Sequence, residues 1–179
     1  MSPTCLGNPT WPKLRVISHD EGVSVPRFDG VEIPVPRFAA DDGSADPVLA
    51  EALRLFGEGV GSREQVNVAL GAARVLVPMV ALLEEAEIGA DGILRDKSSS
   101  MATVSMVGSD GRRALLAFTS MELMRAFNRE ARPAPALGAE ACRSALEQGD
   151  DALLVDCQGP VRFAVTASDL VELASRSST

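Results

Sequence analysis

The stretch Met101–Arg129 constrains the fold most, because it combines two β-strands, a tight turn and the start of a helix. Residues 101–107 and 112–118 contain many β-branched and apolar residues, which favour strands. The segment Gly108–Gly111 between them reads Gly-Ser-Asp-Gly, and these residues are typical of tight turns. We therefore predict a β-hairpin. Its second strand is apolar on both faces and should lie inside a sheet.

A helix should follow this hairpin at once. Thr119 and Glu122 have the spacing of a capping box, in which a hydroxyl and an acid satisfy the free N–H groups of the first turn. This spacing predicts a helix that begins at Ser120, and we expect Phe118, just before it, to be buried. The apolar face of this helix would consist of Leu123, Met124 and Phe127.

The C-terminal part of the chain repeats this pattern. Residues 152–156 and 161–165 form a second candidate hairpin, with a turn through 158–160. Ala164–Leu170 then matches Ala117–Leu123: a strand end, a threonine, an acid three residues on, and a leucine. Duplication and convergence both explain the match. Capping boxes recur without common ancestry, so we favour convergence.

Other helices and strands follow from local signals. Asp46 and Pro47 predict the start of a helix that runs to about Phe56, and Ser62 with Gln65 predicts a second that ends near Ala73. Residues 74–83 predict an apolar strand, in which Pro78 marks an edge position or a bulge. Residues 132–135 predict a stiff linker, and residues 138–148 predict a helix that stops at Gly149.

Together these elements predict an α+β fold. A mixed β-sheet of about five strands, built from two ββα units and covered by packed helices, would form one domain over residues 41–176. Residues 1–40 contain six prolines and repeat Val-Pro-Arg-Phe at 25–28 and 35–38. They are either an extended arm along the domain, a partner-binding segment, or a loosely ordered tail. We favour the tail, because proline-rich termini are commonly mobile.

Composition narrows the classes of function. The net charge of -8 opposes binding to nucleic acids or to anionic membranes. No apolar run reaches the length of a membrane span, and the N-terminus lacks the pattern of a signal peptide. Three widely spaced cysteines form no C-x-x-C pair. A reducing cytoplasm is therefore the expected location.

The inventory of reactive residues is poor. His19 is the single histidine, and the chain has no tyrosine, no Walker A loop and no G-x-S-x-G motif. Asp41–Pro47 is rich in acids but lacks the alternating spacing of a calcium loop, so Asp46 is better explained as a helix cap. We expect Cys142 and Cys157 to be buried, unreactive thiols. We therefore expect no enzyme, no cofactor and no metal.

One loop is the best candidate for a site. Asp96, Lys97, Ser98 and Ser99 combine a cation, an acid and hydroxyls just before the first hairpin. Arg112 and Arg113 are possible neighbours, although full pairing of the hairpin would place them beside Val107 and away from Lys97. A solvated, serine-rich connector is the alternative. The acids of residues 84–91 are either a solvated face or a pair for acid–base chemistry or cation binding.

Four segments in order along the chain carry a family resemblance: Asp41–Pro47, Arg95–Val104, Arg112–Leu123 and Gly159–Val165. Together they resemble actinobacterial members of the SseB family over roughly residues 36 to 176. The resemblance implies a small α+β domain from a family connected with enhanced serine sensitivity in enterobacteria. It brings no established catalytic residues, so none is carried over.

The sequence thus favours a cytoplasmic, non-enzymatic domain that binds a protein partner or a small ligand. The alternative is a small enzyme or an amino-acid-linked regulatory protein that uses the 96–99 loop. A buried concave site beside Lys97 would favour the alternative, and a flat apolar edge would favour the non-enzymatic binding domain.

Overall fold

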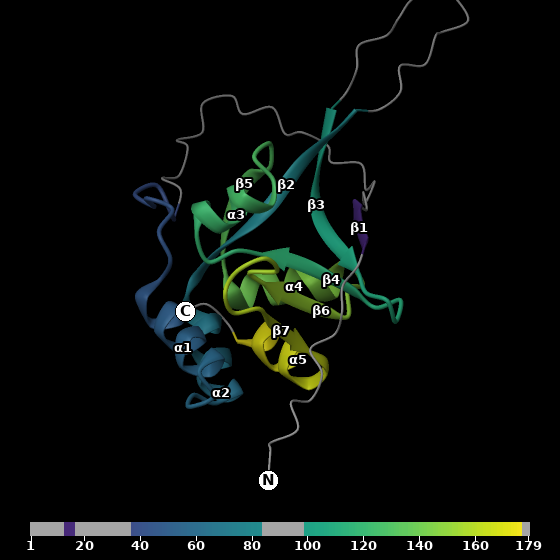
Figure 1. The fold of residues 1–179 in the computed structure, drawn as a ribbon. Coiled ribbons are helices and arrows are strands. Elements are labelled where there is room, and N and C mark those ends of the chain that lie inside the picture. Colours follow the sequence, from purple (N-terminus) through teal and green to yellow (C-terminus); the bar gives the residue numbers. More distant parts are fainter. Residues whose placement is uncertain (1–12, 17–36, 84–98, 177–179) are drawn as a thin grey trace, which may run out of the picture.

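The computed structural model describes residues 13–16, 37–83 and 99–176 (Figure 1). The helices of this part are α1 (Pro47–Gly57), α2 (Arg63–Ala72), α3 (Met121–Phe127), α4 (Gly138–Glu147) and α5 (Ala167–Ser175). Its strands are β1 (Lys13–Val16), β2 (Arg74–Leu83), β3 (Ser99–Val107), β4 (Arg113–Ala117), β5 (Arg132–Leu137), β6 (Ala152–Val155) and β7 (Phe163–Thr166).

These strands form one mixed sheet in the order β5-β2-β3-β4-β6-β7, and β1 pairs with β3 in addition. The neighbours β4 and β6 are parallel, and the other pairs are antiparallel. Both predicted hairpins are present, as β3–β4 and as β6–β7. The α+β class and the mixed sheet are confirmed. The count of about five strands was slightly low, because β5 and β1 were not expected.

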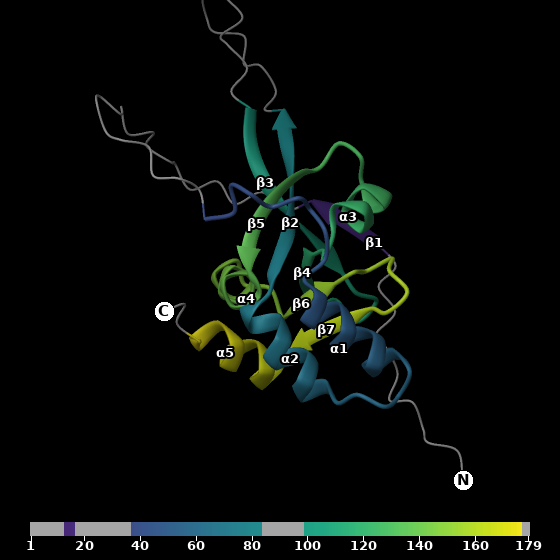
Figure 2. The same ribbon diagram turned by 90° about the vertical axis from the view of Figure 1, so that its left-hand side faces the viewer.

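The sheet buries both of its faces. One face packs against α1, α2, α4 and α5, and the other packs against α3 (Figures 1 and 2). Side chains alternate along β4, so Leu115 contributes to the first core and Leu116 to the second, as predicted for an interior strand. Phe118 follows β4 and is buried with only 1% of its surface exposed, which confirms its predicted place in the core.

The predicted linker at residues 132–135 is wrong, because these residues form the edge strand β5. Leu76 exchanges both of its backbone hydrogen bonds with Phe118 and so turns its polar backbone groups away from β5. Pro135 lies opposite Leu76, and Pro133 lies opposite Pro78. Both β5 prolines therefore point their nitrogens out of the sheet, where no ladder hydrogen bond is lost.

Pro78 was predicted to mark an edge position or a bulge. The edge position is wrong, since β2 lies between β5 and β3, and β2 pairs with β5 in continuous register across Pro78. On the side away from β5, strand β2 pairs first with Phe118, through Leu76, and then with β3 from Met79 onward. Pro78 falls between these two pairings. Its missing N–H thus lies where β2 changes partners, which explains how an interior strand tolerates a proline.

The helix caps follow the predictions in α1 and α2 and depart from them in α3. Asp46 accepts two backbone N–H groups at the start of α1, and Ser62 forms the capping box of α2. In α3 the cap is Ser120, whose hydroxyl accepts from the N–H of Leu123, rather than Thr119. The predicted boundary was one residue early, because the Thr119 hydroxyl donates to Asp156 instead.

The second edge strand, β7, is covered by a side chain from α2. The guanidinium of Arg63 donates from Nη2 to the carbonyl oxygen of Ala164 at 2.6 Å and lies 4.7 Å from the centroid of the Phe163 ring. Its Nε is 3.5 Å from Asp169 of α5. One arginine thus connects α2, β7 and α5, and it occupies an acceptor that a sheet edge otherwise leaves open.

Candidate functional site

The residues predicted as a site are only partly described. Asp96, Lys97 and Ser98 lie outside the described residues, as do the acids of residues 84–91. Ser99 is the first residue of β3 and pairs with Leu83, whereas Arg113 pairs with Val107 at the other end of the strand. The length of β3 therefore separates Ser99 from the two arginines.

The arginines themselves hold the hairpin and its surroundings together. Arg112 forms a 2.6 Å hydrogen bond to Asp110 within the β3–β4 turn. Arg113 forms a 3.0 Å ion pair with Asp150, whose side chain is fully buried, and Ser105 of β3 donates to the same carboxylate at 2.8 Å. This cluster fixes the end of α4 against the hairpin, because a buried carboxylate requires such partners.

A different place in the fold also collects polar groups, and these lie beside a depression of the surface. Strands β4 and β6 are parallel neighbours, so the segments that follow them emerge at the same end of the sheet. Thr119 comes shortly after β4, and Asp156 comes directly after β6. The carboxylate of Asp156 accepts the backbone N–H of Thr119 at 2.9 Å and its hydroxyl at 2.8 Å. These two bonds tie the segments together.

Asp156 has an unusual backbone and environment. Its φ is 52°, in the left-handed region that residues other than glycine seldom adopt. Its side chain is buried, and burial raises the pKa of the carboxyl above the ordinary value, while the two hydrogen bonds from Thr119 oppose the rise. Strained residues of this kind are frequent at functional sites, although the observation alone assigns no function.

Arg74 fixes a second wall beside this tie. Its guanidinium donates to the carbonyl of Thr119 at 2.8 Å, to Asp41 at 2.9 Å, and to the carbonyl of Ser44. The loop 41–44 is thereby held against the start of α3, where the N–H of Met121 donates to the carbonyl of Gly43. Gly43 has φ +80°, and a Cβ there would lie 2.9 Å from that of Met121, so this close approach requires glycine.

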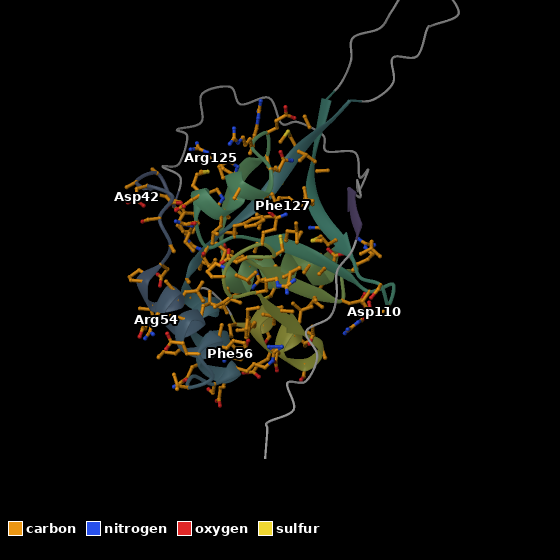
Figure 3. All side chains as sticks on the ribbon, in the orientation of Figure 1. Asp42, Arg54, Phe56, Asp110, Arg125 and Phe127 are labelled. Carbon is orange, nitrogen blue, oxygen red and sulfur yellow. The ribbon has the colours of Figure 1, made fainter. Side chains whose placement is uncertain are left out.

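A groove of about 570 Å³ opens between these segments and α1. We call it the strand-end groove, and its walls include Leu53, Arg54, Thr119, Leu123, Asp156 and Val161. Most of this surface is apolar. At the rim, Arg54 projects from α1 and bonds to both Glu51 and Glu58 (Figure 3). The groove can therefore receive an apolar group, with charged side chains around its entrance.

The described cysteines and the Thr119 hydroxyl are poorly suited to catalysis. Burial raises the pKa of the Cys157 thiol to about 11, and that of Cys142 to about 12, so both stay protonated near neutral pH. The hydroxyl of Thr119 already donates to Asp156. Within residues 37–83 and 99–176, no three histidine, cysteine, aspartate or glutamate side chains gather in a way that could hold a metal ion.

Sequence reasoning missed this groove. Its walls come from segments around residues 53, 119 and 156, which are distant in the chain and meet only in the folded sheet. One signal was present, since Thr119 and Asp156 each end a predicted strand. The parallel pairing of β4 with β6, which brings the two residues together, was not predicted.

Comparison with known proteins gives one result. Residues 49–172, more than half of the chain, match the family model of the SseB protein N-terminal domain, whereas no curated protein and no solved structure matches significantly. In the part of the chain that the structure describes, no helix has the length and apolar character needed to cross a membrane. The matched region starts in α1, ends in α5 and contains the whole strand-end groove apart from Ala45. The chain therefore belongs to the SseB family through its N-terminal domain.

Proposed function

We propose that this chain is a cytoplasmic, non-enzymatic module that binds a partner protein in the strand-end groove. The observation that carries the proposal is the groove itself, a mostly apolar depression at the end of two parallel strands. Depressions in this position are common binding sites in sheets with parallel strands, because rigid strands hold the surrounding loops in place.

The chemistry around the groove favours binding over catalysis. Leu53, Leu123 and Val161 form apolar walls. An apolar side chain that displaces water from these walls makes the free energy of binding more favourable. Asp156 and Thr119 satisfy each other, so they stabilise the floor of the groove rather than a reacting group. The free thiols of Cys142 and Cys157 fit the reducing cytoplasm that the sequence favours.

The proposal can be tested by filling the groove. Ala50 is an exposed residue of α1 that lines the groove, so Ala50→Trp should occupy the space without disturbing the core. Ala72, exposed at the end of α2, provides a matched control as Ala72→Trp. Peptides would first be selected from a phage-displayed random library on the full chain, and their affinities for the three proteins would then be measured by fluorescence anisotropy.

We expect Ala50→Trp to lower the affinity for the selected peptides at least about tenfold, which corresponds to about 1.4 kcal/mol of binding free energy. Ala72→Trp should bind them like the unchanged protein, and both variants should unfold cooperatively. Equal affinity of all three proteins for every selected peptide would rule out the strand-end groove as the binding site.

A further inference from the structure

The strand-end groove continues into a second depression along α3. This depression, of about 1100 Å³, shares Ala45, Ser120 and Glu122 with the groove. Its far end is lined by Arg125 and Arg129, and the loop 41–44 forms the opposite wall. Figure 3 shows Arg125 on α3 and Asp42 on the facing loop. The two depressions therefore adjoin at these shared residues, and the mostly apolar groove lies beside a depression lined by two arginines.

The arginines at this end are available to a ligand. Within the described residues, the side chains of Arg125 and Arg129 form no hydrogen bond and no ion pair, and both residues are exposed. Two acids also line the depression. The Asp42 carboxylate already accepts the N–H and the hydroxyl of Ser44, at 2.8 and 2.6 Å, which holds it within its own turn. Glu122 lies where the two depressions meet, on the side of the apolar groove.

Charge elsewhere on the chain sharpens the contrast. The protein carries a net charge of -8, so its overall field repels acidic molecules. The guanidinium groups of Arg125 and Arg129, which have no partner among the described residues, form a local exception to that field beside an apolar groove. Each can present two parallel N–H donors to a carboxylate, a geometry that a lysine cannot reproduce.

Resting on the proposed function, we infer that the bound partner segment is an acidic peptide. It places an apolar side chain in the strand-end groove and a carboxylate, a few residues away along an extended chain, at Arg125 and Arg129. An extended segment advances about 3.3 Å per residue, so a few residues are enough to reach from one depression into the adjoining one. The apolar contact provides affinity, and the arginines select for acidic sequences.

The experiment reverses the charge of Arg125 and Arg129 and leaves the strand-end groove unchanged. The double variant Arg125→Glu, Arg129→Glu would be compared with Arg112→Glu, Arg176→Glu, which reverses the same number of charges in the β3–β4 turn and at the end of α5. The probes are the peptides selected from the phage-displayed library, each also made with its acidic residues changed to amides. Affinity is measured at low and at high salt, and sedimentation reports the oligomeric state.

We expect the selected peptides to be rich in Asp and Glu beside an apolar residue. The Arg125, Arg129 variant should bind them about tenfold more weakly, with a reduced dependence on salt, and the control variant should differ far less. The peptides with amides in place of their acidic residues should bind the unchanged protein about tenfold more weakly than the acidic peptides do.

Four results would overturn the inference. Peptides that are sensitive to Ala50→Trp but indifferent to the Arg125, Arg129 reversal would leave the proposed function standing and remove the acidic partner. Peptides that are also indifferent to Ala50→Trp, or a library that yields no peptide at all, would remove both. A dimer of the unchanged protein that Ala50→Trp dissociates would show that a second copy of the chain occupies the groove instead.

Discussion

Asp156 shows how a single residue can hold two distant segments at a fixed spacing. Its carboxylate joins the end of β6 to the segment after β4 through two hydrogen bonds, and its backbone has a positive φ. Aspartate tolerates this backbone better than most residues other than glycine. The same side chain is buried, so its ionisation is opposed by the loss of solvent and favoured by the bonds from Thr119.

This balance predicts how stability depends on pH. Because burial raises the pKa of Asp156 in the folded protein, the folded state binds its proton more tightly than the unfolded chain does. Its contribution to stability is present in acid and is lost as the pH rises from about 3.8 through the raised folded pKa. Asp156→Asn cannot titrate, can still accept the N–H of Thr119, and tolerates the positive φ.

We therefore expect the free energy of unfolding of the unchanged protein, minus that of Asp156→Asn, to fall as the pH rises through this window. Urea titrations of both proteins at a series of pH values would measure the difference. A difference that grows with pH would mean that the hydrogen bonds outweigh burial and that the pKa of Asp156 is lowered.

At the scale of the elements, helix α1 packs closely against the β6–β7 turn through a glycine. Gly57 is the last residue of α1, and a Cβ at this position would lie 2.5 Å from Cγ2 of Val161. Glycine is unfavourable inside a helix by about 1 kcal/mol relative to alanine. Its presence here is explained by the side chain that it faces.

The contact predicts a change of sign between two backgrounds. Gly57→Ala should destabilise the unchanged protein by about 1–3 kcal/mol, because the stiff valine cannot move aside without strain. In a Val161→Ala protein the same change should stabilise by up to about 1 kcal/mol, since the clashing methyl is gone and the helix propensity remains. Denaturant titration of the four proteins gives both values. A stabilising effect in both backgrounds would show that the turn yields to the helix.

Elements defined by local chemistry could be predicted, and elements defined by pairing could not. The caps Asp46 and Ser62 act within one turn of their helices, so their sequence signal was sufficient. The strand β5 depends on its hydrogen bonds to β2, and its prolines resemble those of a linker. Thr119 was assigned a cap from its spacing, but its partner Asp156 lies far along the chain and overrides the local preference.

At the scale of the whole molecule, the two buried cores begin at Leu49. Every described residue in them belongs to the region from α1 to α5, and the chain before residue 37 contributes only the strand β1 to the described part. The strand β3, with which β1 pairs, is also held by β2 and β4. The N-terminal segment, residues 1–40, thus contributes none of the core residues that the structure describes.

We expect a protein that lacks residues 1–30 to unfold in a single cooperative transition, since every core residue that the structure describes lies outside the deletion. Calorimetry and urea titration by circular dichroism would measure this transition, with the full chain as the reference. A truncated protein that melts gradually would mean that the arm is part of the cooperative unit.

The edge strands β5 and β7 have a consequence for recognition. Pro133 and Pro135 offer no donors along β5, and Arg63 occupies the carbonyl of Ala164 on β7. Many domains capture peptides by adding a strand, so main-chain bonds supply affinity for almost any extended sequence. Here the edges of β5 and β7 discourage that general mode. A partner that binds in the strand-end groove, as proposed, would instead be distinguished by its side chains, so changing a single anchoring residue of that partner would weaken the association markedly.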